Sequence, residues 1–270
     1  EAKTLLRLRR HPNIVELYDA FQEGPERLCL IMEYCDGGDL AQRIAAARAE
    51  RIKDEEGNTT IGLPLSEALH VFMQVALALK HCHKHNVSHR DIKPANIFLT
   101  LQGIVRLGDF GIARDGADRG SHQFAVAGTP LYMAPEVLRG DTTSSSGHLA
   151  DVWAVGCVLY EMVSPSLDPP FTAPNLPTLV RRIVTEPPTP LPDLLRIGAR
   201  YHRTEDDGGM PDDTMAQEAD DLGSLCWLLD GLLTKQPKER LSIEHALSGK
   251  LCTPLTKHYK PDRLRRSLSR

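Results

Sequence analysis

The sequence predicts an α+β fold of two unequal parts, a small strand-containing part followed by a larger, mainly helical part. Two strand-like runs, residues 14–21 and 28–34, are separated by the turn-rich segment EGPER, which is the pattern of an antiparallel pair. Farther along, apolar residues recur at helical spacing from Leu69 to Leu77, and residues 154–163 are apolar nearly all round a helix. We therefore expect this last helix to be buried in the middle of the larger part.

The first element is expected to be a short helix that carries Leu5 and Leu8. It should end at residues 11–13, because the residue before a proline is pushed out of the helical region. Residues 48–64 are charged and contain glycine, so we expect an exposed insertion there, ahead of a helix that starts at Ser66.

The larger part continues with an expected hairpin at residues 97–107. Residues 186–221 carry several prolines and acidic runs, which predict a second insertion or surface loop. Residues 253–270 are expected to form a basic tail.

Composition argues against several classes of partner. The formal net charge of −4 provides no global basic field, so no nucleic-acid partner is expected. No run of 18 apolar residues occurs, so no membrane span is expected. The six cysteines include no C-x-x-C pair, which favours buried, reduced thiols and a cytoplasmic location.

The most informative segments are HRDIKPAN at residues 89–96, DFG at residues 109–111 and APE at residues 134–136. Each tripeptide alone means little, but in this order and at this spacing they match the signature set of protein kinases. The sequence therefore resembles eukaryotic Ser/Thr protein kinases from its first residue to about residue 250.

Within that group the sequence is most similar to the NIMA-related (NEK) kinases. The stretches that carry this resemblance are HPNIVELYDAF, MEYCDGGDL, HRDIKPANIFL, GDFGIAR, GTPLYMAPE and NLPTLVRRIV. The resemblance implies a two-lobed fold, with a remnant of the β-rich N-lobe at residues 1–34 and a mainly helical C-lobe at residues 35–252. It also extends the expected location to the cytoskeleton, the basal body or the centrosome.

The resemblance implies ATP and Mg²⁺ as cofactors, and protein substrates that bear Ser or Thr. Asp91 would act as catalytic base on the substrate hydroxyl, and Lys93 would supply a cation to the transferring phosphoryl group. Asn96 and Asp109 offer hard oxygen ligands for the metal ion.

The resemblance also predicts a nucleotide-binding surface. Met32 would be the gatekeeper, the hinge would follow it, Phe98 would form the floor below adenine, and Asp39 would meet a ribose hydroxyl. The hinge residues, whose backbone groups would bind adenine, are Glu33, Tyr34 and Cys35.

The resemblance also implies structural roles for three further residues. Glu136 should pair with Arg240, and Asp151 should accept hydrogen bonds from the backbone of the loop that carries Asp91.

The sequence departs from the family pattern at its beginning. It contains no G-x-G-x-x-G loop and no V-A-I-K strand, both of which precede the first helix in kinases. Glu1 is the candidate for the helix glutamate that pairs with the missing lysine. The sequence begins with Glu rather than Met, so we expect a fragment that binds ATP poorly and transfers phosphate slowly.

The segment between residues 109 and 136 departs as well. Arg90 before the catalytic aspartate is typical of kinases in which a loop phosphate orders this segment. Ala125 stands where NEK-like kinases usually place a hydroxyl residue. We therefore expect Ser121 to be phosphorylated, by an activating kinase or by autophosphorylation.

Two other function classes remain open alongside the kinase. A pseudokinase-like scaffold or binding module would use the two insertions for interaction, and a small-molecule kinase is disfavoured by the APE segment. Histidines 81, 83 and 85 suggest a metal site, but at a helix end with no expected acidic partner they favour a structural role.

Overall fold

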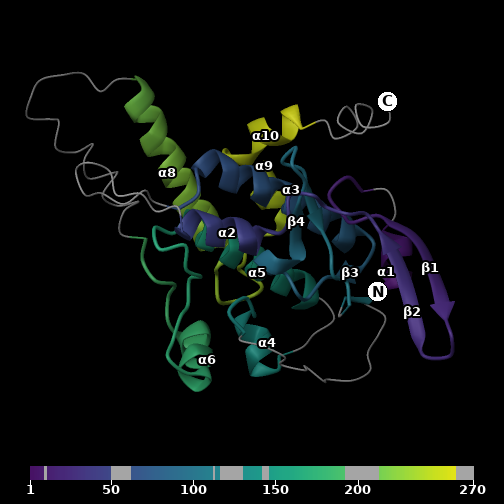
Figure 1. Cartoon of the computed structure of the whole chain (residues 1–270). Coiled ribbons are helices and arrows are strands. Elements are labelled where there is room, and N and C mark those ends of the chain that lie inside the picture. Colours follow the sequence, from purple (N-terminus) through teal and green to yellow (C-terminus); the bar gives the residue numbers. More distant parts are fainter. Residues whose placement is uncertain are drawn as a thin grey trace, which may run out of the picture.

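The computed structural model describes residues 1–8, 11–49, 62–111, 113–115, 130–141, 146–191 and 213–259. The strands are β1 (Leu17–Glu23), β2 (Arg27–Met32), β3 (Val87–Ser88), β4 (Ile97–Leu99), β5 (Val105–Leu107) and β6 (Arg114–Asp115), and the 3-10 helix is η1 (Pro94–Asn96). The helices are α1 (Ala2–Arg7), α2 (Leu40–Ala49), α3 (Leu65–Lys84), α4 (Pro135–Arg139), α5 (Ser146–Val163), α6 (Leu176–Thr185), α8 (Asp213–Leu232), α9 (Ile243–Ser248) and α10 (Cys252–His258). Figure 1 shows β1 and β2 with α1 at one end of the molecule and the other helices filling the rest, which confirms the predicted α+β class.

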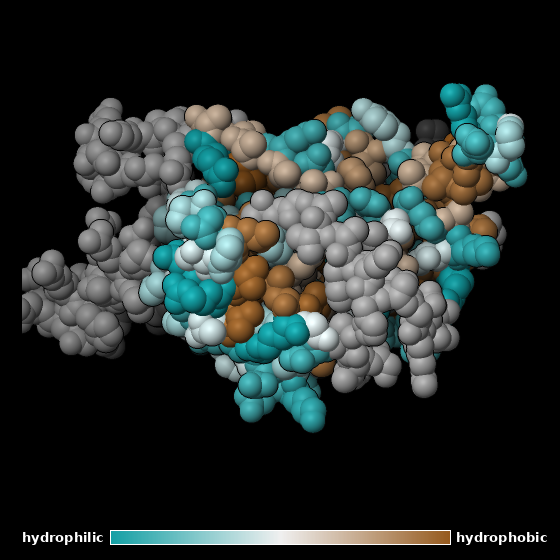
Figure 2. All heavy atoms as spheres, turned by 90° about the horizontal axis from the view of Figure 1, so that it is seen from below, coloured by the Kyte–Doolittle hydropathy of each residue, from teal (hydrophilic) through white to brown (hydrophobic). Residues whose placement is uncertain are grey.

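The predicted antiparallel pair near the N-terminus is confirmed. β1 and β2 pair with Leu17 opposite Met32, and the register shifts at the next step along β1. Only the first residue of β1 is buried, and several large apolar side chains of this hairpin are exposed. Apolar residues accordingly gather at the right-hand end of Figure 2, where Figure 1 places these strands. The described residues thus leave both faces of this sheet largely uncovered.

The helix α5 forms the centre of the larger part, as predicted. It begins at Ser146 and is buried on nearly every side from Val152 onward, and α3 packs against it. The fully buried ring of Trp153 stacks on Phe171, with ring centroids 5.8 Å apart. No helix in the described part of the chain is both long enough and apolar enough to cross a membrane.

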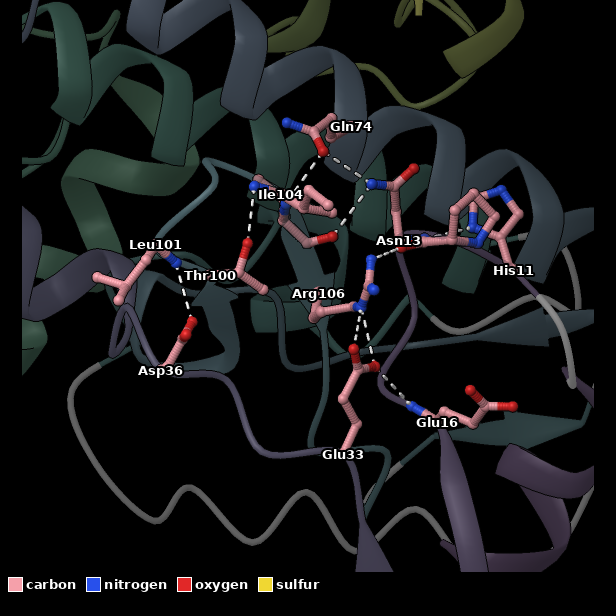
Figure 3. A network of polar contacts seen from close by, with 12 residues as sticks. His11, Asn13, Glu16, Glu33, Asp36, Gln74, Thr100, Leu101, Ile104 and Arg106 are labelled. Atoms are coloured by element: carbon pink, nitrogen blue, oxygen red, sulfur yellow. Dashed lines mark hydrogen bonds and ion pairs between the residues drawn. The ribbon is translucent and has the colours of Figure 1, made fainter. Parts of the chain in front are cut away.

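A buried amide joins the small part to the larger one (Figure 3). The side chain of Asn13 is fully buried and donates to Gln74 Oε1 of α3 at 2.9 Å and to the carbonyl of Val105 at 3.0 Å. The same segment pairs with β5, since the N–H of Leu107 donates to the carbonyl of Asn13 at 2.9 Å. The N-terminal segment therefore pairs with the predicted hairpin of β4 and β5.

The insertion expected at residues 48–64 is wrong at both ends. Residues 48 and 49 belong to α2, and Leu63 is buried with its N–H donating to the carbonyl of Met162 at 2.8 Å. Residues 50–61 lie outside the described part of the chain. The next helix begins at Leu65, one residue before the expected Ser66.

The second insertion, expected at residues 186–221, is also too long. Residues 213–221 form the first part of α8, and the N–H of Thr189 donates to the carbonyl of Pro170 at 3.0 Å. The segment 192–212 lies outside the described residues, as do 260–270 of the predicted tail. Part of that tail is ordered, since residues 253–258 belong to α10.

The predicted pairing of Glu136 with Arg240 is confirmed. Two nitrogens of the guanidinium donate to the two carboxylate oxygens at 2.7 and 2.8 Å, and both side chains are excluded from solvent. Arg240 also donates to the carbonyls of Leu149 and Thr234, at 2.6 and 3.0 Å. This one side chain therefore ties α4 to the start of α5 and to the segment after α8.

Replacing Arg240 with Met should lower the free energy of unfolding by about 3–5 kcal/mol, because Glu136 would be left as an uncompensated buried charge. Urea denaturation followed by tryptophan fluorescence measures this loss. Arg27→Met is the matched control, since the Arg27–Glu23 pair is 4.0 Å long and both side chains are mostly exposed. A loss at Arg240 no larger than at Arg27 would contradict the structural role of the buried pair.

Candidate active site

The carboxylate of Asp151, at the start of the buried part of α5, holds the loop that follows β3. Its Oδ2 accepts the N–H of His89 at 2.9 Å, and its Oδ1 accepts the N–H of Arg90 at 2.8 Å. The Nε2 of His83 lies 2.9 Å from the same Oδ2. Burial has the largest single effect and opposes the charge of Asp151. The hydrogen bond and charge of His83, the charge of His89 and the N–H of Arg90 together outweigh it and hold the pKa of this carboxyl below its usual value. The role expected for Asp151 is thus confirmed by its two contacts with backbone N–H groups of the loop.

The backbone of this region adopts left-handed conformations at two non-glycine residues. Arg90 has a φ of 69° and Asp109 has a φ of 57°. Such conformations cost on the order of 1–3 kcal/mol and persist where neighbouring interactions fix them, often at functional sites. Asp151 supplies one of these interactions, because it accepts the N–H of Arg90.

Three of the predicted catalytic residues meet on this loop. The Nζ of Lys93 lies 2.6 Å from Oδ2 of Asp91. The side-chain amide of Asn96 donates to the same oxygen at 2.9 Å and to the backbone carbonyl of Asp91 at 2.8 Å. The turn η1 follows Lys93 and ends at Asn96, which brings Asn96 back to Asp91. The Asp91 carboxylate is therefore oriented by one cation and one amide.

Asp109, the fourth predicted residue, lies beyond β5 and is connected to the same loop through its neighbours. The N–H of Gly108 donates to the carbonyl of Asn96 at 3.1 Å, and the carbonyl of Gly108 lies 2.9 Å from Nε2 of His89. The ring of Phe110 is fully buried, with its centroid 4.6 Å from that of His89. Asp109 itself is exposed, and one of its oxygens accepts the N–H of Gly111 at 3.3 Å.

The side-chain oxygens of Asn96 and Asp109 are of the kind that binds Mg²⁺. Because the side-chain nitrogen of Asn96 donates to Asp91, the side-chain oxygen of Asn96 remains as the atom that could bind the ion. The second oxygen of Asp109 is a hard anionic donor on an exposed residue. Two such oxygens suit an ion that is usually bound by one or two protein carboxyl or carbonyl groups together with substrate phosphates.

Phe98, the predicted floor of the nucleotide surface, lies directly beside Gly108. A Cβ added to Gly108 would stand 2.7 Å from the ring of Phe98 and 2.9 Å from a methyl group of Val15. Only glycine therefore allows the chain to pass Phe98 on its way to Asp109. Phe98 also forms an isolated antiparallel bridge with Asp39.

The predicted hinge residue Glu33 is held by an arginine that sequence reasoning missed (Figure 3). The Nε of Arg106 donates to both carboxylate oxygens of Glu33 at 2.8 Å, and Arg106 also donates to the carbonyl of Pro12. Arg106 is only 5% exposed, and its position in the otherwise apolar strand Val-Arg-Leu was the available signal. The backbone of Glu33 is fixed too, because its N–H donates to the carbonyl of Glu16 at 2.8 Å.

The other predicted nucleotide-binding residues have less support from contacts. Met32 ends β2 and is partly exposed, and Tyr34 is 87% exposed. Burial and the Glu33 carboxylate raise the pKa of Cys35 to about 11, which keeps this thiol protonated. Asp39 caps α2, with its Oδ1 accepting the N–H of Gln42 at 2.9 Å. Their roles toward ATP stay predictions.

Glu1 is the exposed residue that precedes α1, and its role also stays a prediction. Ser121 and Ala125 lie outside the described residues, so the predicted phosphorylation is not tested. The expectation that the three neighbouring histidines lack an acidic partner is wrong, because His83 bonds to Asp151. Among the described residues, no three His, Cys, Asp or Glu side chains are grouped to hold a metal ion.

Comparisons with known proteins agree with this site. A sequence profile of the family described as "Protein kinase domain" matches residues 1–252. Serine/threonine-protein kinase Nek4 of Mus musculus is 32% identical over 259 residues, which cover 96% of this chain and 27% of that protein. Serine/threonine-protein kinase Nek2 of Homo sapiens is 43% identical over 176 residues, covering 63% of this chain and 36% of that protein. The chain thus spans less than two fifths of the length of each of these two relatives.

Stability should depend on pH through His89. Burial lowers the pKa of this imidazole below 6.5, so the unfolded chain takes up a proton that the folded protein resists. The contribution is present above pH 6.5 and is lost as the pH falls through the unfolded value toward the folded one, with a slope of at most about 1.4 kcal/mol per pH unit. Urea denaturation between about pH 7.5 and 5.5 measures the slope. We expect His89→Asn to flatten it, and an unchanged slope would contradict this assignment.

Proposed function

Because the chain belongs to the protein kinase domain family and is NEK-like, we propose that it transfers the γ-phosphate of ATP to Ser and Thr hydroxyls of protein substrates. The observation that carries this proposal is the Asp91 carboxylate, bonded to both Lys93 and Asn96 on a loop that Asp151 fixes. Phosphoryl transfer needs positioning and charge more than covalent chemistry by the protein, and this arrangement supplies both.

Asp91 accepts the proton of the substrate hydroxyl and orients the attacking oxygen toward the phosphorus. Lys93, at 2.6 Å from that carboxylate, provides the positive charge that faces the transferring group. Asn96 restrains the carboxylate from the other side, so the base is held before the substrate arrives. This preorganisation removes the need to reorient the base during the reaction.

Mg²⁺, when bound, would be held by Asn96 and Asp109 and would neutralise charge on the phosphate oxygens. The backbone of Glu33 and Cys35 would meet adenine, Met32 and Phe98 would border it, and Asp39 would reach the ribose. Support for this arrangement comes from the fixed position of Glu33 and from the close passage of Gly108 beneath Phe98.

The sequence contains neither a G-x-G-x-x-G loop nor a V-A-I-K strand. We propose that these parts are needed from outside the 270 residues, and that Glu1 would meet the lysine of such a strand. Among the described residues, β1 and β2 form a sheet of two strands, so each strand has an edge at which a further strand could pair. We place the reaction in the cytoplasm on the pattern of cysteines, or at cytoskeletal structures on the resemblance to NEK kinases.

Asp91→Asn should lower the rate of phosphate transfer about 10²–10⁴-fold, because the amide cannot accept the hydroxyl proton. Transfer of labelled phosphate from Mg-ATP to a generic Ser/Thr substrate measures the rate, in this chain and in a protein extended upstream. Asp230→Asn, on the exposed face of α8, removes the same charge and should leave the rate unchanged. If the extended protein transfers no phosphate, or if Asp91→Asn retains its rate, the pseudokinase-like scaffold becomes the better interpretation.

We propose Ser121 as the activating phosphorylation site and Arg90 as the residue that binds its phosphate. Its phosphate would add negative charge that an arginine can bind through charge-assisted hydrogen bonds. Ser121→Ala in the extended protein should lower the transfer rate at least several-fold, and Ser267→Ala in the tail serves as control. Equal rates for Ser121→Ala and the unmodified sequence would remove this proposal without affecting the role of Asp91.

A further inference from the structure

A cavity of about 420 Å³ lies between α3, α5 and the start of α9. Figure 1 shows α9 beside α3, with α5 next to them. The polar side chains that line the cavity are Lys80, His83, Lys84, His148, Ser242 and Glu244. Its volume is within the range of sites that hold small molecules. None of the residues assigned to phosphoryl transfer lines it.

Cationic groups predominate in this lining. Lys80 and Lys84 are one turn apart on α3, and both are exposed. In the described part of the chain neither of them forms an ion pair, and Glu244 is the single carboxylate of the lining. Like charges at this spacing repel each other on a helix surface. An anion between the two ammonium groups would convert this repulsion into attraction.

Two imidazoles form another wall of the cavity. The rings of His83 and His148 are stacked, with centroids 4.2 Å apart and an interplanar angle of 18°. Nε2 of His83 is committed to Asp151, at 2.9 Å. Burial and the neighbouring His83 lower the pKa of His148, while Asp151 and Glu244 oppose this and Arg90 adds to it. An anion beside these rings would favour their protonated forms and so gain further charge-assisted contacts.

The rest of the lining is apolar. Leu149 and Val152 of α5 and Ile243 of α9 complete the cavity, so it combines a cationic rim with a hydrophobic surface. This combination suits an anionic group attached to a small organic body better than a fully hydrated ion. Ser242 adds a hydroxyl, although its oxygen already accepts the N–H of His245 at 3.2 Å.

We propose that this cavity binds a phosphate dianion, either free or as the phosphomonoester of a small organic molecule, between Lys80, Lys84 and the His83–His148 stack. The inference does not depend on phosphoryl transfer at Asp91. It does connect the cavity to that site, because the Asp151 oxygen that bonds His83 also accepts the N–H of His89.

Isothermal titration of the full chain with phenyl phosphate, inorganic phosphate and phenol tests the proposal. We expect one saturable site for phenyl phosphate and none for phenol. Tighter binding of phenyl phosphate than of inorganic phosphate would identify the ester as the ligand, and equal binding would identify the free ion. Both results support a phosphate site. Phenol that binds as tightly as phenyl phosphate would overturn it, as would the lack of any saturable binding.

Variants locate the site within the chain. The double substitution Lys80→Gln, Lys84→Gln should weaken binding of phenyl phosphate about tenfold or more, through the loss of two charge-assisted contacts. The control double substitution Lys238→Gln, Lys257→Gln removes two exposed charges elsewhere and should leave the affinity unchanged. Lys93→Met should also leave it unchanged, and a loss of binding in that variant would place the ligand in the catalytic site and overturn the proposal.

Spectroscopy provides a readout that a purely structural role would not change. On addition of phenyl phosphate, the NMR titration of the His148 imidazole should move to higher pH, because the bound anion stabilises its protonated form. An unchanged His148 titration at saturating ligand would overturn the proposed contact with the histidine stack.

Discussion

The carboxylate of Asp151 is the one group on which the geometry of the candidate site depends. It is fully buried at the start of the most buried helix, and it accepts two consecutive backbone N–H groups of the loop that carries Asp91. This contact helps to hold the left-handed backbone of Arg90, a conformation that is costly for a residue with a long side chain. The loop that carries Asp91 is thus anchored by a group for which we propose no part in phosphate transfer.

The remaining supports of the loop extend from this anchor. The ring of His89 packs against that of Phe110 in a tilted arrangement, and His89 bonds to the carbonyl of Gly108. The N–H of Gly108 donates to the carbonyl of Asn96. Asn96 in turn bonds to Asp91. Together with the N–H of Asp91, which donates to Nδ1 of His89 at 3.3 Å, these contacts form a closed circuit of hydrogen bonds in which every member is buried or half-buried. In such a circuit each bond restrains two others, so the reacting carboxylate is positioned without a rigid side chain of its own.

The sequence predicted the long apolar helices and the two hairpins, because their periodicity is strong. It missed α2, whose ten residues contain only two large apolar side chains, Leu40 and Ile44. The available signal was local: Asp39 followed three residues later by Gln42 has the form of a capping box, and the cap is formed. Both predicted insertions were too long for a related reason. Charge and proline density indicated exposure, but they did not indicate where tertiary contacts such as that of Leu63 begin.

For the site, sequence motifs predicted the reacting groups and the Asp151 anchor but not the side chains that couple them to the fold. His83 was interpreted without Asp151, since 68 residues separate the partners, and Arg106 was not considered as the partner of Glu33. The two halves of the candidate site are held to the rest of the fold by different numbers of buried contacts. The catalytic half rests on α5 and on buried contacts within the larger part, whereas the predicted nucleotide half rests on an exposed two-stranded sheet joined through Arg106 and Asn13. Because few buried contacts hold that sheet, local unfolding should release the hinge well before it disturbs the loop around Asp91.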